Sequence, residues 1–247
     1  MGKSRKPSKT KKPTKAKKIN IKIKPKNKAY YGWTPDVPDQ RDLMFSLPKK
    51  MKKLPSKVDL RLEELPVFDQ GALGSCTANA ISAAFAFSVL KQKEEAFYIP
   101  SRLFIGVCTE KTWPYVISKF TNKPTDICYK EAAGNKAIKY ERLTRSLYDF
   151  KSCLASGFPF VGGFAVYESF ESKEVTKTGM MPMPGKDEKF YGGHAILVMG
   201  YDDSIQCFIV RNSWGTKWGD KGYFYMPYDY LLNRNLSDDF WVIQKVT

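Results

Sequence analysis

The amino-acid sequence predicts an α+β protein with two lobes, the first helical and the second rich in strands. Apolar residues recur at helical spacing between Ser75 and Glu95. From Phe158 onward apolar and polar residues alternate between turn-forming residues, as they do in strands. At 247 residues the chain can bury a full core, either as one large domain or as two lobes that share a cleft. A helical half followed by a strand-rich half is typical of an α+β fold.

The basic character of the chain is concentrated in residues 1–28, which we call the tail. The net charge is +16, but the tail holds 13 Lys or Arg and no acid, which leaves 28 bases against 25 acids in the remainder. This low-complexity segment cannot bury enough apolar surface to fold, so we expect it to be disordered. Two roles stay open: a solubilising tail, or a nucleic-acid contact or nuclear-import segment, because clustered lysines neutralise phosphates without a fold.

Residues 29–57, which we call the strap, interleave aromatic side chains with prolines. Proline restricts its own backbone and that of the preceding residue, so the segment is expected to be extended rather than helical. Its aromatic residues indicate a strap that lies along a folded surface, and its simplest role is a structural arm. The residues concerned are Tyr30, Tyr31, Trp33 and Phe45, with Pro35, Pro38 and Pro48.

Residues 58–247 are expected to form the folded body, with a first lobe over about 58–150 and a second over about 151–247. In the first lobe Ser75 is a candidate N-cap for the helix that runs to about Glu95. The buried face of that helix is predicted to consist of Ile81, Ala84, Phe85, Ser88 and Val89. A short second helix is predicted around Tyr129–Glu141.

In the second lobe the pattern predicts strands separated by two clear turns. The turns are expected at 202–204 and 219–222, where Asp, Ser and Gly cluster. The strands are expected to include Phe160–Val161, Phe164–Val166, Ala195–Met199, Phe208–Val210 and Tyr223–Met226.

The five cysteines are widely and irregularly spaced, and the chain has one histidine. With no CxxC pair we expect no metal site, and we expect no cofactor. Free thiols in a reducing compartment are the simplest account. No apolar run reaches the ~18 residues of a membrane span, and the N-terminus lacks the apolar core of a signal peptide. We therefore expect an intracellular monomer, in the cytoplasm, the nucleus or a virion-like particle, with no membrane contact.

The single histidine, His194, is the natural base for any acid–base chemistry near neutral pH. Cys76 falls at the start of the predicted long helix, where free N–H groups and the helix dipole lower the pKa of a thiol. Asn212 follows a predicted strand and precedes two tryptophans, and an asparagine can fix the tautomer and orientation of an imidazole. Against this, a cysteine beside an apolar helix is more often a small buried hydrophobe.

Three separated segments, DQGALGSCTANA, GGHAILVMGYDD and VRNSWGTKWGDKGYF, resemble the papain-like (C1) cysteine peptidases in identity and in order. The resemblance covers about Val58 to Trp241. The strap sequence YGWTPDVPDQRDLMF resembles the N-terminal segment of the branch that lacks the large propeptide of the cathepsins. The resemblance implies a papain-like two-lobe fold, with an active-site cleft between a helical left lobe and a β-rich right lobe.

The resemblance also implies a role for each site residue. Cys76 is the nucleophile and His194 the base and later general acid, the two forming a thiolate–imidazolium pair. Asn212 orients His194, and Gln70 supplies the side-chain donor of the oxyanion hole. The reaction is acyl transfer through a thioester, followed by hydrolysis of a peptide or protein substrate. Residues implied to bind substrate are Gly74, Gly193 and Trp214, and the strap is implied to inhibit or to cover the cleft.

The chain departs from the family pattern near the nucleophile and in the spacing. Thr77 stands where an aromatic residue is usual, and Leu73 stands where many members have a half-cystine. Only 118 residues separate Cys76 from His194, against roughly 130–150 in the family. The shortfall is expected around Ile105–Val107, where the family has a strand that binds substrate backbone.

Two other functions stay open. One is a weakly active or inactive papain-like scaffold that binds nucleic acid or a protein partner through the tail. The other is an amidase or acyltransferase that uses the same cysteine–histidine pair.

Overall fold

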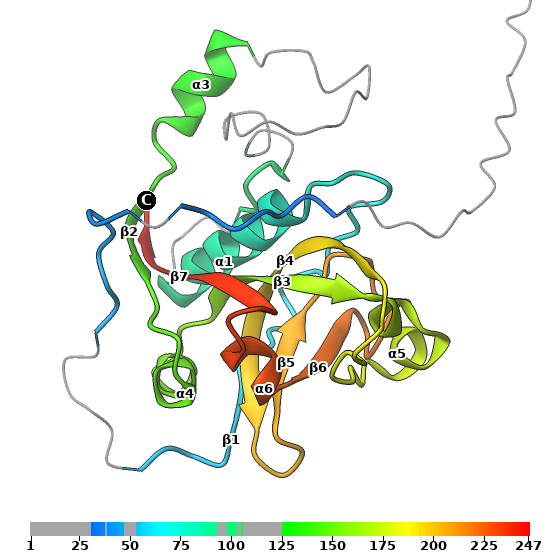
Figure 1. Cartoon of the computed structure of the whole chain (residues 1–247). Helices are drawn as coiled ribbons and strands as arrows, with labels where there is room; N and C mark the ends of the chain where they lie inside the picture. The colour runs from blue at the N-terminus through cyan, green and yellow to red at the C-terminus, as the bar shows by residue number, and fades with distance from the viewer. Residues whose placement is uncertain (1–30, 38, 47–52, 93–97, 103–104, 106–124) are drawn as a thin grey trace, which may run out of the picture.

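The computed structural model describes residues 31–37, 39–46, 53–92, 98–102, 105 and 125–247 (Figure 1). The strands within these ranges form one antiparallel sheet in the order β2-β7-β3-β4-β5-β6, with β1 paired to β4. The strands are β1 (Lys57–Asp59), β2 (Ala137–Arg142), β3 (Phe160–Tyr167), β4 (Phe190–Asp202), β5 (Cys207–Arg211), β6 (Tyr223–Pro227) and β7 (Ser237–Val246). The helices are α1 (Cys76–Gln92), α3 (Asp126–Ala132), α4 (Leu147–Ala155), α5 (Lys173–Thr178) and α6 (Tyr228–Leu232), with a 3₁₀ turn at Glu168–Glu171.

The central strand β4 separates two cores, because successive side chains point to opposite faces of a strand. Leu197 and Met199 pack on the face covered by α1, in a core that includes Ala84 and Phe85. Ile196 and Val198 belong to the core on the opposite face. That second core is rich in phenylalanine from α4 and the sheet, namely Phe150, Phe160, Phe208 and Phe240.

Helix α1 begins at Cys76, as predicted, and is described as far as Gln92. Of the predicted buried face, Ala84, Phe85, Ser88 and Val89 are buried and Ile81 is half-buried. Burial also extends beyond that face, to nearly every side of the helix over Ser82–Val89. Alanines and serines let neighbouring segments approach the helix closely all round. A helix in this position needs no polar face, so its sequence carries little amphipathic pattern.

The predicted short helix around Tyr129–Glu141 is confirmed only for Tyr129–Ala132. The helix in this region, α3, ends at Ala132, and a turn at 133–135 leads into strand β2. Gly134 and Asn135 break the helix, and the Asn135 side chain caps it by donating to the Glu131 carbonyl at 3.0 Å. Strand β2 then pairs with β7, a partner more than a hundred residues away that local spacing cannot indicate. The predicted boundary between lobes near residue 150 lies inside α4.

The described part of the strap is extended, as its prolines predict, and runs across the molecule in blue in Figure 1. Near its start the Trp33 N–H donates to the Gly193 carbonyl on β4 at 3.0 Å. Farther along it pairs with the edge strand β2, where the Phe45 N–H donates to the Arg142 carbonyl at 2.8 Å. The chain then enters β1, which pairs with β4. The strap therefore contacts two separate strands of the sheet before the body begins.

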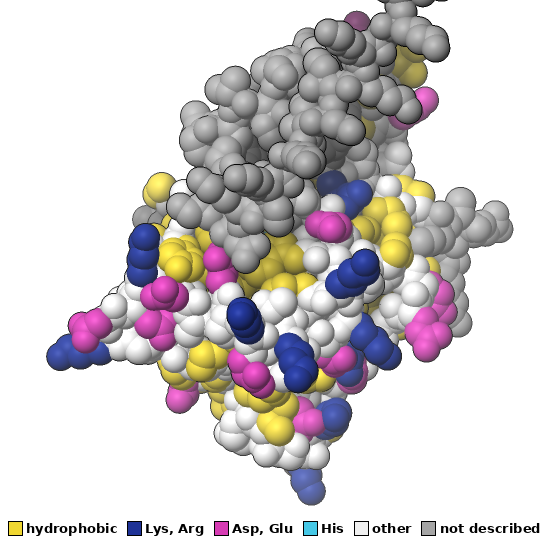
Figure 2. All heavy atoms as spheres, turned by 90° about the vertical axis from the view of Figure 1, so that its right-hand side faces the viewer, with side chains coloured by type: hydrophobic (Ala, Val, Ile, Leu, Met, Phe, Trp, Pro, Cys, Tyr) yellow, Lys and Arg dark blue, Asp and Glu magenta, His cyan; other side chains and the backbone are white. Residues whose placement is uncertain are grey.

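The surface of the body carries mixed charge. On the face in Figure 2 the basic and acidic side chains are interspersed, as expected when the net charge lies mainly in the tail. Within the described ranges no helix has the length and apolar character needed to cross a bilayer.

Candidate active site

Three distant parts of the chain meet at the junction of α1 and the sheet. Cys76 is the first residue of α1, His194 lies in β4, and Asn212 directly follows β5. Each of the three is buried, and His194 and Cys76 are 0 % exposed. Because β4 and β5 are adjacent antiparallel strands, residues near their facing ends come close together. The structure thus brings together the three residues that the sequence singled out.

The imidazole of His194 is held by Asn212. The distance from His194 Nε2 to Asn212 Oδ1 is 2.8 Å. An amide oxygen can only accept, so Nε2 carries a hydrogen and Nδ1 is left for the sulfur of Cys76. Within the described part of the chain Nδ1 has no partner with ordinary hydrogen-bond geometry. Its contact with the thiol is thus long or poorly aligned, which is usual for a catalytic pair without substrate.

The thiol of Cys76 is more acidic than an ordinary cysteine. Burial alone raises its pKa, but hydrogen bonding and the charge of His194 lower it, as do the backbone N–H groups of Ala195 and Gly32. The lowering effects win, and the pKa is about 7. A substantial fraction of the thiol is therefore ionised near neutral pH, and the thiolate is the nucleophilic form.

Aromatic rings cover the imidazole. The Trp214 ring centroid lies 5.1 Å from that of His194, and Trp218 packs edge-on against Trp214 at 5.0 Å. Phe164, opposite His194 in β3, meets the imidazole edge-on at 5.7 Å. These rings exclude water from the bond between His194 and Asn212, which strengthens it.

Gln70 is held rigidly in the loop that precedes α1. Its Oε1 accepts from the Ser213 hydroxyl at 2.6 Å, and its Nε2 donates to the Leu73 carbonyl at 2.7 Å. The side chain is only 5 % exposed. These bonds fix the orientation of the side-chain amide in the loop that leads into Cys76.

Of the three residues implied to bind substrate, two contact the strap. Gly193 accepts from the Trp33 N–H, and Trp214 lies 6.2 Å from Tyr31 between ring centroids. Gly74 is buried two residues before α1. The predicted shortfall around 105–107 lies almost wholly outside the described residues.

Sequence reasoning missed the residues that hold the strap in the site. The Tyr31 hydroxyl donates to Glu171, and the Tyr31 ring meets His194 edge-on at 5.9 Å. Trp33 Nε1 donates to Asp239 at 3.0 Å. The aromatic residues of the strap were visible as a group, but nothing near Glu171 or Asp239 in the sequence signals a role at a site.

The described cysteines are all free thiols, namely Cys76, Cys128, Cys153 and Cys207. The pKa of Cys76 is lowered, whereas burial raises the pKa of Cys153 and of Cys207. The site thus consists of a thiol at the start of α1 and an imidazole on β4 that is held by the side-chain amide of Asn212. This arrangement is suited to acyl transfer.

Comparisons with known proteins all indicate the same family. A family model described as papain family cysteine protease matches residues 93–236, a range that includes His194 and Asn212. A peptidase C1-like protein of Acanthamoeba polyphaga mimivirus is 39 % identical over 88 % of this chain and 87 % of its own length. The thiol protease aleurain of Arabidopsis thaliana is 30 % identical over 70 % of this chain.

Solved structures agree. Xylellain, a cysteine protease from Xylella fastidiosa, superposes with a TM-score of 0.80 at 38 % identity and covers 89 % of this chain and 97 % of its own. A procathepsin B from Trypanosoma congolense shares the fold, with a TM-score of 0.60 at 15 % identity. The chain belongs to the papain family of cysteine proteases. It spans only 56 % of the length of aleurain, so it is shorter than that plant relative.

Proposed function

We propose that the chain is a peptidase in which Cys76 and His194 cleave peptide bonds through a thioester. The Cys76 thiolate attacks the carbonyl carbon, the C–N bond breaks, and His194 gives its proton to the leaving amine. Water, deprotonated by His194, then adds to the thioester and releases the acid and the thiol. The observation that carries the proposal is a wholly buried thiol at the start of α1 beside an imidazole that Asn212 holds at 2.8 Å, an environment that lowers the pKa of the thiol.

Two donors are positioned for the oxyanion of the tetrahedral intermediate. One is the side-chain amide of Gln70, held by Ser213 and Leu73. The other is the backbone N–H of Cys76, which lies in the first turn of α1, where N–H groups have no partner within the helix. Fixed donors aimed at a developing charge supply a large share of the rate enhancement in acyl transfer.

The experiment that tests the peptidase is selective modification of the nucleophile. Incubation of the full chain with an epoxide warhead, followed by peptide mapping, is expected to place the adduct on Cys76. Hydrolysis of a mixed peptide library is expected in parallel, and to disappear in Cys76→Ala. A folded protein whose Cys76 is modified neither in the full chain nor in the Tyr31→Ala variant, or whose hydrolysis survives Cys76→Ala, would contradict the proposal. Cleavage of small amides but not of peptides would favour an amidase or acyltransferase instead.

We further propose that the strap, residues 29–57, holds the enzyme inactive until it leaves the site. Three neighbouring residues occupy the site: the Tyr31 ring stands against His194, the Gly32 N–H points to the sulfur, and Trp33 binds Gly193. The group that the strap presents to the sulfur is an N–H donor, which a nucleophile cannot attack. A segment bound in this way excludes substrate and resists cleavage.

Point variants test the strap without removing Lys57, which is both the last residue of the strap and the first of β1. Tyr31→Ala removes the ring against His194 and the bond to Glu171, so it is expected to raise both epoxide labelling of Cys76 and peptide hydrolysis. Tyr140→Ala is the matched control, because that tyrosine is exposed on β2, which β7 and β3 separate from β4 and His194. Unchanged or lower labelling in Tyr31→Ala would count against inhibition.

The tail, residues 1–28, supports a second candidate function, which is nucleic-acid binding by a weakly active papain-like scaffold. Thirteen basic residues without one acid are the observation in its favour. Binding through lysines is expected to weaken steeply with salt. Retention of a DNA or RNA duplex by an intact chain that fails the epoxide test would favour the scaffold. We propose a monomer in a reducing compartment, which the free thiols of the described cysteines support.

A further inference from the structure

Arg211 is a buried charge to which the proposed mechanism gives no role. It is the last residue of β5, directly before Asn212, and only 2 % of it is exposed. Among the described residues no carboxylate forms an ion pair with it, and its hydrogen bonds go to neutral oxygens. Burial lowers the pKa of its guanidinium. A buried charge without an opposite charge beside it is costly, so the contacts that it makes indicate why it is there.

The guanidinium of Arg211 binds the loop that carries Gln70. Its Nη1 donates to the Leu65 carbonyl at 3.0 Å, and its Nη2 donates to the carbonyl of the next residue, Pro66. The guanidinium also lies over the Phe68 ring, 5.1 Å from the ring centroid. One side chain thus contacts the loop at three places shortly before Gln70. A planar fork of donors can hold two neighbouring carbonyls at once, whereas the ammonium of a lysine is a single point of attachment.

Backbone hydrogen bonds join the same loop to the segment that follows Asn212. The Gln70 N–H donates to the Ser213 carbonyl at 2.8 Å, and the Gly215 N–H donates to the Phe68 carbonyl at 2.9 Å. The Ser213 hydroxyl in turn holds the side-chain amide of Gln70. The loop and the end of β5 therefore form one hydrogen-bonded unit.

The Phe68 ring is held by a second guanidinium, that of Arg102, at 4.6 Å from the ring centroid. Arg102 also donates to Asn79 Oδ1 in α1 at 3.3 Å. The side chain of Asn79 donates to the carbonyl of Ser75, the residue before Cys76, at 2.8 Å. Through Phe68 the loop is thus connected to the first turn of α1 as well as to the end of β5.

We propose that Arg211 is a positioning residue for the oxyanion hole: its fork holds the loop against the end of β5 and so keeps the Gln70 amide where it can donate to the oxyanion. The inference rests on the proposed peptidase function. A fixed donor needs no reorganisation when charge develops, and a donor displaced by about 1 Å loses much of its effect on the rate. In a purely structural role Arg211 would stabilise the fold but not the transition state.

Arg211→Lys tests the proposal, because it keeps the charge and removes the fork. Two rates are measured on the full chain: kcat/KM for an internally quenched peptide, and alkylation of Cys76 by iodoacetamide, which forms no oxyanion. A closed strap lowers both rates by the same factor, so their ratio does not depend on the strap. This ratio is expected to fall about 10-fold in Arg211→Lys. An unchanged ratio would overturn the proposal.

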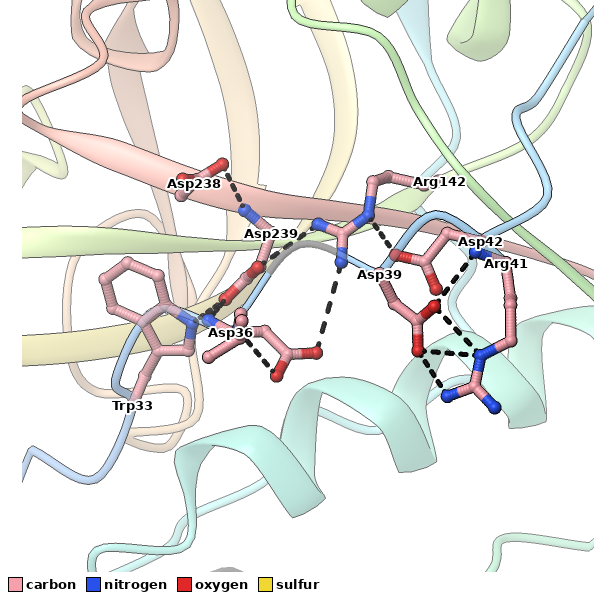
Figure 3. Close-up of polar contacts among 9 residues, drawn as sticks. Trp33, Asp36, Asp39, Arg41, Asp42, Arg142, Asp238 and Asp239 are labelled. Carbon is pink, nitrogen blue, oxygen red and sulfur yellow. Dashed lines mark hydrogen bonds and ion pairs between the residues drawn. The ribbon is translucent and has the colours of Figure 1, made fainter.

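All variants are compared in an Asp42→Asn background, which weakens the strap away from the site. Asp42 accepts from Arg142 Nε at 2.8 Å, and Figure 3 shows this pair beside the bond between Arg142 and Asp239. Loss of the carboxylate charge is expected to raise peptide hydrolysis and alkylation equally. The strap residues next to the site, Tyr31 and Trp33, are left unchanged.

A double-mutant cycle with Gln70 separates positioning from stability. In the Gln70→Ala background Arg211→Lys is expected to change the ratio less than about twofold, because the donor that it positions is gone. Equal effects of Arg211→Lys with and without the Gln70 side chain would assign it a purely structural role and overturn the proposal.

Two controls show that the effect belongs to the loop. Tyr223→Phe removes the other hydrogen bond of the same guanidinium, 3.1 Å from Nη1, and leaves both loop carbonyls bound. Arg145→Lys is the matched substitution, since Arg145 Nη1 donates to the Leu231 carbonyl in α6 at 3.1 Å. Both variants are expected to leave the ratio within about twofold of the background, even where the melting temperature falls. A ratio that either lowers as much as Arg211→Lys does would overturn the proposal.

Phe68→Leu is the second variant, and it decides the question if Arg211→Lys does not fold. It keeps an apolar side chain but removes the ring under the guanidinium, so the ratio is expected to fall about 3-fold, and not to fall in Gln70→Ala. No fall, or an equal fall in Gln70→Ala, would overturn the proposal. A chain whose Cys76 is alkylated but which hydrolyses no peptide disproves the proposed function and this inference with it. Hydrolysis with a ratio that Arg211→Lys leaves intact disproves only the role of Arg211.

Discussion

Two cysteines in this protein are equally buried and chemically opposite. Cys76 and Cys153 are both 0 % exposed, one in the core beneath α1 and the other in the core on the opposite face of the sheet. The pKa of Cys76 is about 7, whereas burial raises the pKa of Cys153 well above its ordinary value. Lys91 lowers the pKa of Cys153, but less than burial raises it.

The difference lies in the polar groups within reach of each sulfur. Cys153 donates to one backbone carbonyl, that of Phe158 at 3.3 Å, which favours the neutral thiol. Cys76 instead meets an imidazole and two backbone N–H groups, all of which favour the anion. Burial therefore does not decide whether a thiol is reactive. The balance of donors and acceptors around it decides, and burial strengthens the effect of both.

The largest expected effect is that of removing the imidazole. His194→Ala leaves Cys76 buried without its main stabilising partner, so the site should become like that of Cys153. Peptide hydrolysis is expected to fall by about 10³-fold or more. The pH at which the alkylation rate of Cys76 is half its maximum should move upward from about 7. A His194→Ala variant that keeps more than a few per cent of the activity would contradict the mechanism.

The next effect concerns Gln70, the proposed oxyanion donor in the loop before Cys76. Gln70→Ala removes the side-chain donor of the oxyanion hole, and kcat is expected to fall about 10²- to 10³-fold with little change in the labelling of Cys76. Gln244→Ala is the control, since that amide donates to Glu141 at the sheet edge. Steady-state kinetics measures the change in kcat, and alkylation rates measure the change in labelling of Cys76. An equal loss of both would mean that Gln70 supports the thiolate rather than the oxyanion.

The two thiols can be compared directly in one sample. At pH 7 iodoacetamide is expected to modify Cys76 at least about 100-fold faster than Cys153, because only the thiolate reacts. Labelling of Cys76 rises with pH through about 7, since deprotonation of the thiol produces the nucleophile. Tyr31→Ala serves as the background in which the strap is loosened. Peptide mapping measures modification of both cysteines. Comparable rates at the two would contradict the claim that their surroundings, rather than their burial, set their reactivity.

The smallest effect tests whether Cys153 has any part in the chemistry. Cys153→Ala removes a small buried group beside Phe150, and is expected to lower the free energy of unfolding by about 1 kcal/mol. For a chain of this size this corresponds to a melting temperature lower by roughly 2–4 °C. Peptide hydrolysis should be unchanged. A loss of activity at constant stability would show that the second thiol contributes to function.

The sequence predicted the α+β fold class and the three residues that meet at the site, but it did not predict every element of the fold. Cys76, His194 and Asn212 each stand in a short segment rich in glycine or tryptophan, so their signals are local. Strand β2 was predicted as part of a helix because its partner β7 lies about a hundred residues away. The spacing of apolar residues predicted α1 but not that it is buried on nearly every side. Glu171 and Asp239 had no signal, since they acquire a role only where the strap meets them.

The strap also continues without a break into β1, which is paired with β4. If it acts as proposed, the inhibitor and the site form one molecule, and opening is a first-order event. Dilution cannot separate them, and substrate must compete with a ligand whose effective concentration is set by the intervening chain, in the millimolar range for short flexible connections. After opening without cleavage the strap is still attached and can return, so inhibition of this kind is reversible.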